Sequence, residues 1–349
     1  DFLSNGEYFD RYFKISSKHK KILWLLIFMG RNIPKKIDGN ILIIHNKKVF
    51  FKYNLFFLLN YFLTTIIRNR LDFKNIFHQL RQETCFALKI DSFLKKILSK
   101  KKIDRLYLPY ESQTFQNQII LTAKTCNKRI KIYGYEHTLV SLPINNIYKS
   151  PSPDFLYIHS HAQKNIYIKF LKWPKKKIIN IPSLRFLKKG KQFFDQKIFL
   201  PNNILSKEEL VKNFEIFLNY FYSKKIKPFN NVRIHPLQKE SKKHNLFKKE
   251  INDLIKNYEN IFSNTSKHSY SVFFGATSSV IEALENGSNV IHIVDNATFE
   301  TYSSKLWPSI NVNMINKNIF RYTLKTKNKC ITFGNRQRNF NLPKFLEQK

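Results

Sequence analysis

The sequence predicts an α/β fold built from two Rossmann-like domains that face a cleft. Strand-like apolar runs alternate with amphipathic helical stretches through residues 91–184, as expected for parallel strands joined by helical crossovers. The same alternation resumes over residues 206–293. The chain has 349 residues, more than a single core usually organises, so two domains of about 150 residues each are expected.

The first predicted domain, residues 1–190, begins with short apolar runs. A hairpin is expected over residues 39–54, where a polar turn at 46–48 separates two strand-like runs. Two other apolar stretches, residues 22–29 and 54–67, fall short of the roughly 20 residues of a membrane-spanning helix. We interpret them as core elements or as a surface in contact with lipid.

The rest of this domain is predicted as alternating helices and strands. Pro109 is expected to end one of the strands. The expected helices cover residues 91–103, 115–128 and 162–173, and the expected strands cover residues 103–110, 129–135, 153–160 and 176–184.

The second predicted domain spans residues 191–349. The lysine-rich stretch 188–203 lacks clean periodicity and is interpreted as the interdomain linker. A helix over residues 206–224 is expected to begin with Ser206 as its N-cap, with Glu209 three residues on. Beyond it, the pattern predicts a strand over 230–236, a helix over 247–258, and a strand, loop, helix and strand over 272–293.

The composition indicates an anionic partner, because the formal net charge of +37 is far beyond what solubility requires. A bias toward A/T-rich codons would also enrich Lys together with Ile, Asn and Phe, and this alternative stays open. The basic residues are spread along the chain without a recognisable nucleic-acid-binding motif, so nucleic acid is less favoured than a phosphorylated substrate or a membrane surface. The three cysteines (Cys85, Cys126 and Cys330) form no C-x-x-C pair, which favours a reducing cytosol over a disulfide framework or a zinc site.

Small and hydroxyl-bearing residues separate the strand and the helix predicted over 272–293. Gly275, Thr277, Ser278 and Ser279 lie on the turn where the helix begins. Backbone N–H groups and the positive end of the helix dipole favour a phosphate there, and the hydroxyls add donors while leaving room for it. The alternative is that Ser279 and Glu282 form a capping box that stabilises the helix start without any ligand.

A second basic feature lies at the end of the strand over 230–236. Strand alternation buries Val232 and Ile234 and places Arg233 and His235 on the opposite face, next to Pro236. An imidazole donor beside a helix start can stabilise a departing phosphate. A single histidine in a strand is more often structural, but its pairing with the downstream Ser-Ser helix start favours the phosphate-binding interpretation.

Acid–base candidates follow two strands of the first domain. Glu111 comes directly after the strand over 103–110, and Glu136 and His137 come directly after the strand over 129–135. A carboxylate or imidazole at this edge could take a proton from an acceptor hydroxyl. The alternative for Glu111 is that it caps the helix that begins near Gln113.

No metal site is predicted. His159 and His161 would share one face of a strand, but no carboxylate or cysteine lies nearby in the sequence to complete a ligand set. The chain also has no Asp-x-Asp motif, in agreement with a reaction that needs no metal.

Two short motifs resemble those of a known enzyme group. The stretch "RIHP", followed some forty residues later by "TSSVIEAL", is similar to the HP and Ser-Ser motifs of GT-B glycosyltransferases that use cytidine-nucleotide donors. This group includes bacterial sialyl-, polysialyl- and Kdo-transferases and, more distantly, the CDP-glycerol polymerases of teichoic acid synthesis. The resemblance implies that His235, Ser278 and Ser279 hold the donor phosphate. Arg233, Gly275, Thr277 and Glu282 are the further expected donor-binding residues.

The first half resembles bacterial surface-carbohydrate proteins through "PYESQTFQNQIILTAK", "YGYEHT", "SPDFLYIHS" and "IPSLR". In that group Gln-His is commoner than the Glu136-His137 of this chain, which favours Glu111 as the base and leaves His137 as the alternative. The Asp/Glu-Asp/Glu-Gly motif of the sialyltransferases is not found. The likeness covers roughly residues 103–295.

The resemblance implies an inverting, metal-independent GT-B glycosyltransferase, with an acceptor-side domain over 1–190 and a donor-binding domain over 191–349. A CMP-sugar would supply an acidic sugar of the nonulosonate or Kdo type, and a glycan or lipid-linked glycan would accept it. We expect no cofactor and no nucleic-acid partner. The expected location is cytoplasmic and peripheral, on the anionic surface of the inner membrane.

Two alternatives stay open at the level of the sequence. A CDP-alditol phosphotransferase of the teichoic-acid kind would use the same phosphate site but attack phosphorus. A non-catalytic GT-B shell that binds glycans or polyanions would bind no CMP, and its binding to a polyanion would fall steeply with salt.

Overall fold

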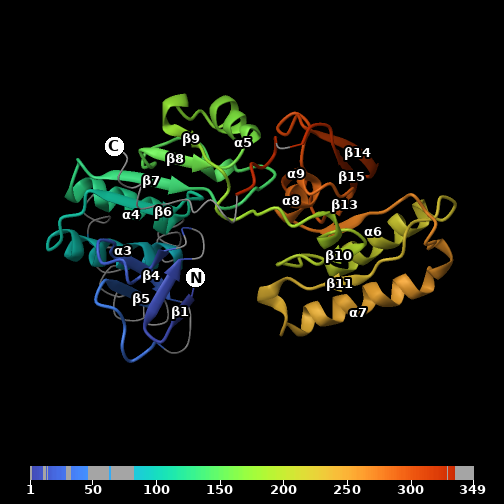
Figure 1. Cartoon of the computed structure of the whole chain (residues 1–349), viewed down its shortest axis with the longest axis horizontal. Helices are drawn as coiled ribbons and strands as arrows, with labels where there is room; N and C mark the ends of the chain where they lie inside the picture. The colour runs from blue at the N-terminus through green and yellow to red at the C-terminus, as the bar shows by residue number, and fades with distance from the viewer. Residues whose placement is uncertain are drawn as a thin grey trace. The chain divides into compact units, whose positions relative to one another are not determined.

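The structure is a computed structural model that describes residues 2–10, 13, 15–28, 33–45, 63, 82–327 and 329–334. It confirms the predicted α/β class, since helices alternate with strands and both larger sheets contain parallel pairs (Figure 1). The chain divides into two compact units. Unit 1 comprises residues 1–135, 148–156 and 336–349, and unit 2 comprises residues 136–147 and 157–335.

These units differ from the two domains that the sequence suggests. Residues 136–147 and 157–190 belong to unit 2, on the same side of the division as residues 191–335. The domains 1–190 and 191–349 therefore stay a prediction, and the site residues are described below by the unit to which each belongs.

The beginning of unit 1 contains two small groups of strands. Strands β1 (Phe2–Ser4), β2 (Glu7–Asp10) and β3 (Ile15–Ser16) form an antiparallel meander. Strands β4 (Trp24–Phe28) and β5 (Ile41–His45) pair in parallel, so the apolar run 22–29 contains a strand. The second half of the hairpin expected over 39–54 lies outside the described residues, as does the stretch 54–67 apart from Leu63.

The alternation predicted from residue 91 onward is confirmed. Helix α3 begins earlier than predicted and packs against α4, while β6 and β7 pair in parallel. The elements are α3 (Gln82–Leu98), β6 (Arg105–Pro109), α4 (Thr114–Cys126), β7 (Lys131–Tyr135), β8 (Phe155–Ile158), α5 (His161–Asn165) and β9 (Ile178–Asn180), and the sheet order is β6-β7-β8-β9.

Unit 2 contains a six-stranded sheet with the order β11-β10-β12-β13-β15-β14. Its first four strands run in parallel, and β15 and β14 are antiparallel to their neighbours. The strands are β10 (Lys197–Phe199), β11 (Asn231–Arg233), β12 (Ser271–Phe274), β13 (Val290–Ile293), β14 (Ile310–Asn316) and β15 (Ile319–Leu324).

The interpretation of residues 188–203 as a linker is wrong, because β10 lies within this stretch and pairs with both β11 and β12. Ile198 is fully buried, whereas the ammonium group of Lys197 lies 5.6 Å from the ring centre of Phe193. A strand of only three residues shows one buried position, so the surrounding lysines hide its period in the sequence.

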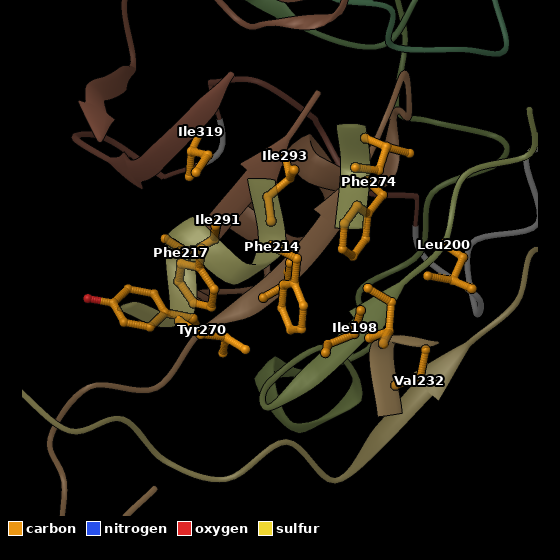
Figure 2. Close-up of a cluster of buried hydrophobic side chains, with 14 of the residues drawn as sticks. Ile198, Leu200, Phe214, Phe217, Val232, Tyr270, Phe274, Ile291, Ile293 and Ile319 are labelled. Atoms are coloured by element: carbon orange, nitrogen blue, oxygen red, sulfur yellow. The ribbon is translucent and has the colours of Figure 1, made fainter. Parts of the chain in front are cut away.

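One face of this sheet carries the phenylalanine-rich core drawn in Figure 2. Val272 and Phe274 of β12 point into it, together with apolar residues of helices α6 (Lys207–Tyr220) and α7 (Lys242–Asn257). Helix α6 begins as predicted, since the Ser206 side chain accepts a hydrogen bond from the Glu209 N–H at 3.3 Å. The core therefore fixes two helices on one face of the strands whose ends form the site.

The opposite face is aromatic near β10 and β12. Phe273 lies between Val272 and Phe274 in sequence, so strand alternation turns it away from the core, and its ring stacks on that of Phe199 at 4.6 Å. Helix α8 (Ser279–Glu285) contacts β12, β13 and β15, and its buried residues lie outside the phenylalanine-rich core. Strand β12 is thus packed on both sides.

Among the helices that the structure describes, none combines the length and the hydropathy that a membrane span requires.

We expect Phe214→Ala to lower the free energy of unfolding by about 3–5 kcal/mol, because it removes a fully buried ring from the centre of the core. Urea unfolding followed by circular dichroism measures the change. The matched control is Tyr222→Ala, which truncates an exposed ring and should alter the free energy by less than about 0.5 kcal/mol. Equal effects in the two variants would contradict the packing described here.

Candidate functional site

The turn after β12 requires glycine for reasons of backbone geometry. Gly275 has a φ of +63°, in the left-handed region that other residues rarely adopt. A Cβ atom added at this position would lie 3.0 Å from Cβ of Pro201, in the segment after β10. The Gly275 N–H donates to the Ile293 carbonyl at 2.8 Å, so packing and hydrogen bonding fix this turn without a ligand.

The three hydroxyl residues after this turn have different roles. Helix α8 begins at Ser279, whose N–H donates to Thr277 Oγ1 at 3.2 Å, so Thr277 is engaged in the start of the helix. The hydroxyls of Ser278 and Ser279 make no hydrogen bond within the described residues, and both residues are partly exposed. These two hydroxyls are the donors that remain available to a ligand.

The capping box considered for Ser279 and Glu282 does not form, because Ser279 is already helical and Ser278 is the N-cap. The Glu282 carboxylate is instead buried and forms an ion pair with the Lys189 ammonium group, at an N–O distance of 3.0 Å. Its backbone carbonyl accepts a hydrogen bond from Asn286 Nδ2 at 2.7 Å. Glu282, expected among the donor-binding residues, thus joins α8 to the segment before β10.

Two buried side chains hold the loop after β12, and the sequence analysis singled out neither. His292 on β13 donates from Nε2 to the Gly275 carbonyl at 2.7 Å. Burial lowers the pKa of His292 to about 4, although the bond to Gly275 opposes this shift, so the ring is neutral near pH 7. The Tyr302 hydroxyl lies 3.0 Å from the Thr277 carbonyl and 2.7 Å from the Leu139 carbonyl, which places residue 139 beside the loop.

His235 lies just beyond β11, where the sequence places it. It precedes a 3₁₀ turn (Pro236–Gln238), and its Nδ1 accepts a hydrogen bond from the Leu237 N–H at 3.3 Å. This bond assigns the ring proton to Nε2. Burial, followed by the nearby charge of Arg185, lowers the pKa of His235 below its usual value. A neutral, partly exposed ring that carries its proton on Nε2 therefore stands at the carboxyl end of the sheet.

Arg185 is a site residue that the sequence analysis missed. Its guanidinium donates to the His137 carbonyl at 3.0 Å and lies 5.1 Å from the ring centre of Phe186. Its charge also acts on His235 and on the buried His159. The stretch "IPSLR", which ends at Arg185 and forms part of the resemblance, could have identified this residue as a candidate.

Arg233 lies on the face of the sheet opposite the phenylalanine-rich core, as strand alternation predicts, and its role in phosphate binding stays a prediction. Its guanidinium lies 5.0 Å from the ring centre of Phe193 and 5.9 Å from that of Phe199. After burial, the charge of Arg185 is the next largest cause that lowers the pKa of His235, and Arg233 is not among the causes. Arg185 is therefore a further candidate for the positive charge beside His235.

His159, which follows β8, and His161, the first residue of α5, do not share one face of a strand. His159 is buried edge-on against Phe186, and burial lowers its pKa to about 3, whereas His161 is exposed at the start of α5. Within the residues that the structure describes, no three His, Cys, Asp or Glu side chains gather closely enough to hold a metal ion. The expectation of a metal-independent reaction stays a prediction.

Glu111 belongs to unit 1 and lies between β6 and α4. It does not cap the helix, because Gln116 Oε1 accepts from the N–H groups of Glu111 at 2.8 Å and Gln113 at 3.1 Å. The Glu111 carboxylate accepts a hydrogen bond from Gln113 Nε2 at 3.3 Å. The structural alternative for Glu111 is therefore wrong, and its role as a base stays a prediction.

The structure brings His137, Arg185, His235 and the loop 275–279 into one unit, whereas Glu111 belongs to the other. No protein-family model matches the chain, and the comparison with curated proteins finds no match.

His292 should make folding stability depend on pH. In the folded protein the pKa of His292 is about 4, below the usual 6.5. The stability that the neutral His292 ring contributes is therefore complete above pH 6.5 and is lost as the pH falls toward 4. We expect the free-energy difference between the wild type and His292→Asn to shrink by about 1.5 kcal/mol between pH 6.5 and pH 5. Urea unfolding at both pH values measures it.

The control for this experiment is His268→Asn, which removes an exposed histidine that lies just before β12. Its free-energy difference from the wild type should be nearly the same at both pH values. A His292→Asn difference that is also constant would show that His292 does not titrate as described.

Proposed function

We propose that the chain is an inverting, metal-independent glycosyltransferase of the GT-B type. It would transfer an acidic sugar of the nonulosonate or Kdo class from a CMP-sugar to a glycan or lipid-linked glycan of the bacterial surface. The observation that carries the proposal is that His235, with its Nε2–H, and the available hydroxyls of Ser278 and Ser279 follow the carboxyl ends of two strands, β11 and β12, of one parallel sheet.

Only β10 separates these two strands, so their ends lie two strand spacings, about 10 Å, apart. One phosphate-bearing ligand is long enough to reach both. The carboxyl edge of a parallel sheet is also where α/β proteins commonly bind nucleotides. Helix α8 has seven residues, so we assign phosphate binding to the side-chain donors more than to the helix dipole.

The chemistry fits these donors. An acceptor oxygen attacks the anomeric carbon, the bond from that carbon to the phosphate oxygen breaks, and CMP leaves with the electron pair. His235 donates a hydrogen bond to the phosphate as its charge grows, and Arg185 supplies the positive charge that a neutral histidine lacks. Departure of a nucleoside monophosphate stabilised in this way needs no metal ion.

The acceptor must lose its proton during the transfer. We assign this proton to Glu111 in unit 1, with His137 in unit 2 as the alternative. Glu111 follows a parallel strand, and its carboxylate accepts a hydrogen bond from the neutral amide of Gln113. The GT-B arrangement, with an acceptor-side domain over 1–190 and a donor-binding domain over 191–349, belongs to this proposal.

We further propose that the protein works at the cytoplasmic face of the inner membrane as a peripheral protein. The net charge of +37 favours an anionic surface. A lipid-linked acceptor would be available there, and no nucleic acid is required.

A thermal-shift screen with CMP, CDP, UDP, GDP and ADP tests the donor class, because a ligand that binds only the folded state raises its stability. We expect CMP to give the largest shift. Product analysis with a CMP-sugar and with CDP-glycerol then separates sugar transfer from alditol phosphate transfer. A chain stabilised by none of the five nucleotides would not be a nucleotide-sugar enzyme.

We expect His235→Ala to weaken CMP binding by about 1–3 kcal/mol, a loss of roughly five- to 150-fold, and to remove most of the turnover. Calorimetry and a transfer assay measure the two effects. His268→Ala is the control, since it truncates an exposed histidine elsewhere in unit 2. If both variants bound CMP like the wild type, the donor site would lie elsewhere.

Glu111→Gln should preserve CMP affinity and lower the transfer rate by about two to four orders of magnitude, the usual contribution of a general base. The amide keeps the size of the side chain and can still accept the hydrogen bond from Gln113, so the melting temperature should not change. A normal transfer rate would exclude Glu111 as the base, and His137→Gln would then be the variant to assay.

A further inference from the structure

The segment from α5 to β9 carries positive charge that no acidic residue offsets. After α5 the chain continues as one π-helical turn (Ile166–Phe170) and a 3₁₀ turn (Lys175–Lys177). No Asp or Glu occurs from residue 155 to residue 194. The exposed lysines of this segment form no ion pair with any described residue; they are Lys169, Lys172, Lys175 and Lys176.

Exposed apolar side chains lie next to these lysines. Phe170, between Lys169 and Lys172 in sequence, is 42% exposed. Ile144 and Ile147, at either end of a second short turn, are 47% and 48% exposed. Aliphatic side chains exposed to this extent beside lysines are characteristic of protein surfaces that enter a lipid interface.

A buried asparagine joins the two segments. Asn146 Nδ2 donates to the Tyr167 hydroxyl at 2.6 Å, and its backbone carbonyl accepts a hydrogen bond from Trp173 Nε1 at 2.6 Å. The rings of Tyr167 and Trp173 are buried and meet edge to face at 5.9 Å. Asn146, which lies between the two isoleucines in sequence, therefore anchors their turn to the lysine-bearing segment.

We propose that this surface, made of residues 144–147 and 169–176, binds an anionic phospholipid bilayer. The lysine ammonium groups would contact headgroup phosphates, and Ile144, Ile147 and Phe170 would enter the boundary of the acyl chains. Nucleic acid fits less well, because single strands are usually held by several exposed aromatic faces and arginine, whereas here only Phe170 is aromatic, Ile144 and Ile147 are aliphatic and all four exposed cations are lysines.

This inference rests on the proposed function for the membrane location and identifies the part of the protein that makes the contact. The segment 136–147 carries Ile144 and Ile147 near one end and His137 near the other, where Arg185 contacts it. The lipid-binding residues are thus continuous in sequence with His137 of the proposed site, which would bring a lipid-linked acceptor near that site.

Sedimentation of the full chain with vesicles tests the proposal. Vesicles of phosphatidylcholine mixed with an equal part of phosphatidylglycerol should bind it much more strongly than phosphatidylcholine alone, and binding should fall with salt. The triple variant Lys172→Gln, Lys175→Gln, Lys176→Gln should lower the partition coefficient about 100-fold, since each lysine near such a surface contributes a factor of about five.

The matched control removes three exposed lysines of α7, as Lys242→Gln, Lys249→Gln and Lys256→Gln, and should lower partition by less than about threefold. Ile144→Ser with Ile147→Ser should cost about tenfold even at high salt, because the lost apolar contact is not screened. Leu246→Ser with Met314→Ser, two exposed apolar residues elsewhere in unit 2, should have no effect.

Equal losses in the two lysine variants would overturn the assignment of this surface. So would a wild type with no preference for anionic vesicles, or one that binds single-stranded DNA and not vesicles. Unchanged melting temperatures exclude misfolding as the cause of any loss. The CMP shift, read on the same samples, separates the two proposals: its absence refutes the CMP-sugar activity while the vesicle results still decide the lipid surface.

Discussion

The pairing of β10 with strands on both sides determines how the candidate site is assembled. Ile198 lies opposite Val232 on one neighbour and opposite Val272 on the other, and both pairings are parallel. The carboxyl ends of β11 and β12 therefore emerge at the same edge of the sheet, one on each side of the segment that begins with Leu200 and Pro201. Without this short strand, the histidine after β11 and the serines after β12 would have no fixed relation to each other.

Much of this architecture could be predicted from residues that repeat with a clear period. Helix α4 and strand β7 match their predicted ranges closely, because over a dozen or so residues the apolar pattern distinguishes helix from strand. Strand β10 could not be recognised, since three residues among lysines show too little of a period. No element was predicted beyond residue 293, so the antiparallel pair β14 and β15 at the edge of the sheet was also missed.

The candidate site was predictable only where a role depends on local sequence. His235 and the serine loop stand next to strand ends, and the sequence locates them directly. Arg185, His292 and Tyr302 contact residues that are 17 to 163 positions away in the sequence. The residues adjacent to them in the sequence carry no pattern that predicts those contacts. Conversely, the capping box of Ser279 and Glu282 satisfied a local pattern, but the helix began one residue away from the position that this pattern needs.

Three histidines of unit 2 have different roles: two support packing, and one is a candidate donor to a ligand. His159 and His292 are buried and neutral, and each lies inside the protein, where it supports the packing of a strand or a turn. The pKa of His235 is also lowered, but this ring is partly exposed, with Nδ1 accepting from the Leu237 N–H and the proton on Nε2. Positive charge at the site thus comes from the Arg185 guanidinium, while His235 contributes one hydrogen-bond donor.

The Tyr302 hydroxyl has one proton and lies within hydrogen-bonding distance of two carbonyl oxygens, those of Leu139 and Thr277. These acceptors belong to different loops, one leading from His137 toward the exposed isoleucines and the other leading into α8. Because a single proton is shared between them, any displacement that shortens one bond must weaken the other. The two loops therefore compete for one donor, and the position of each is set partly by the position of the other.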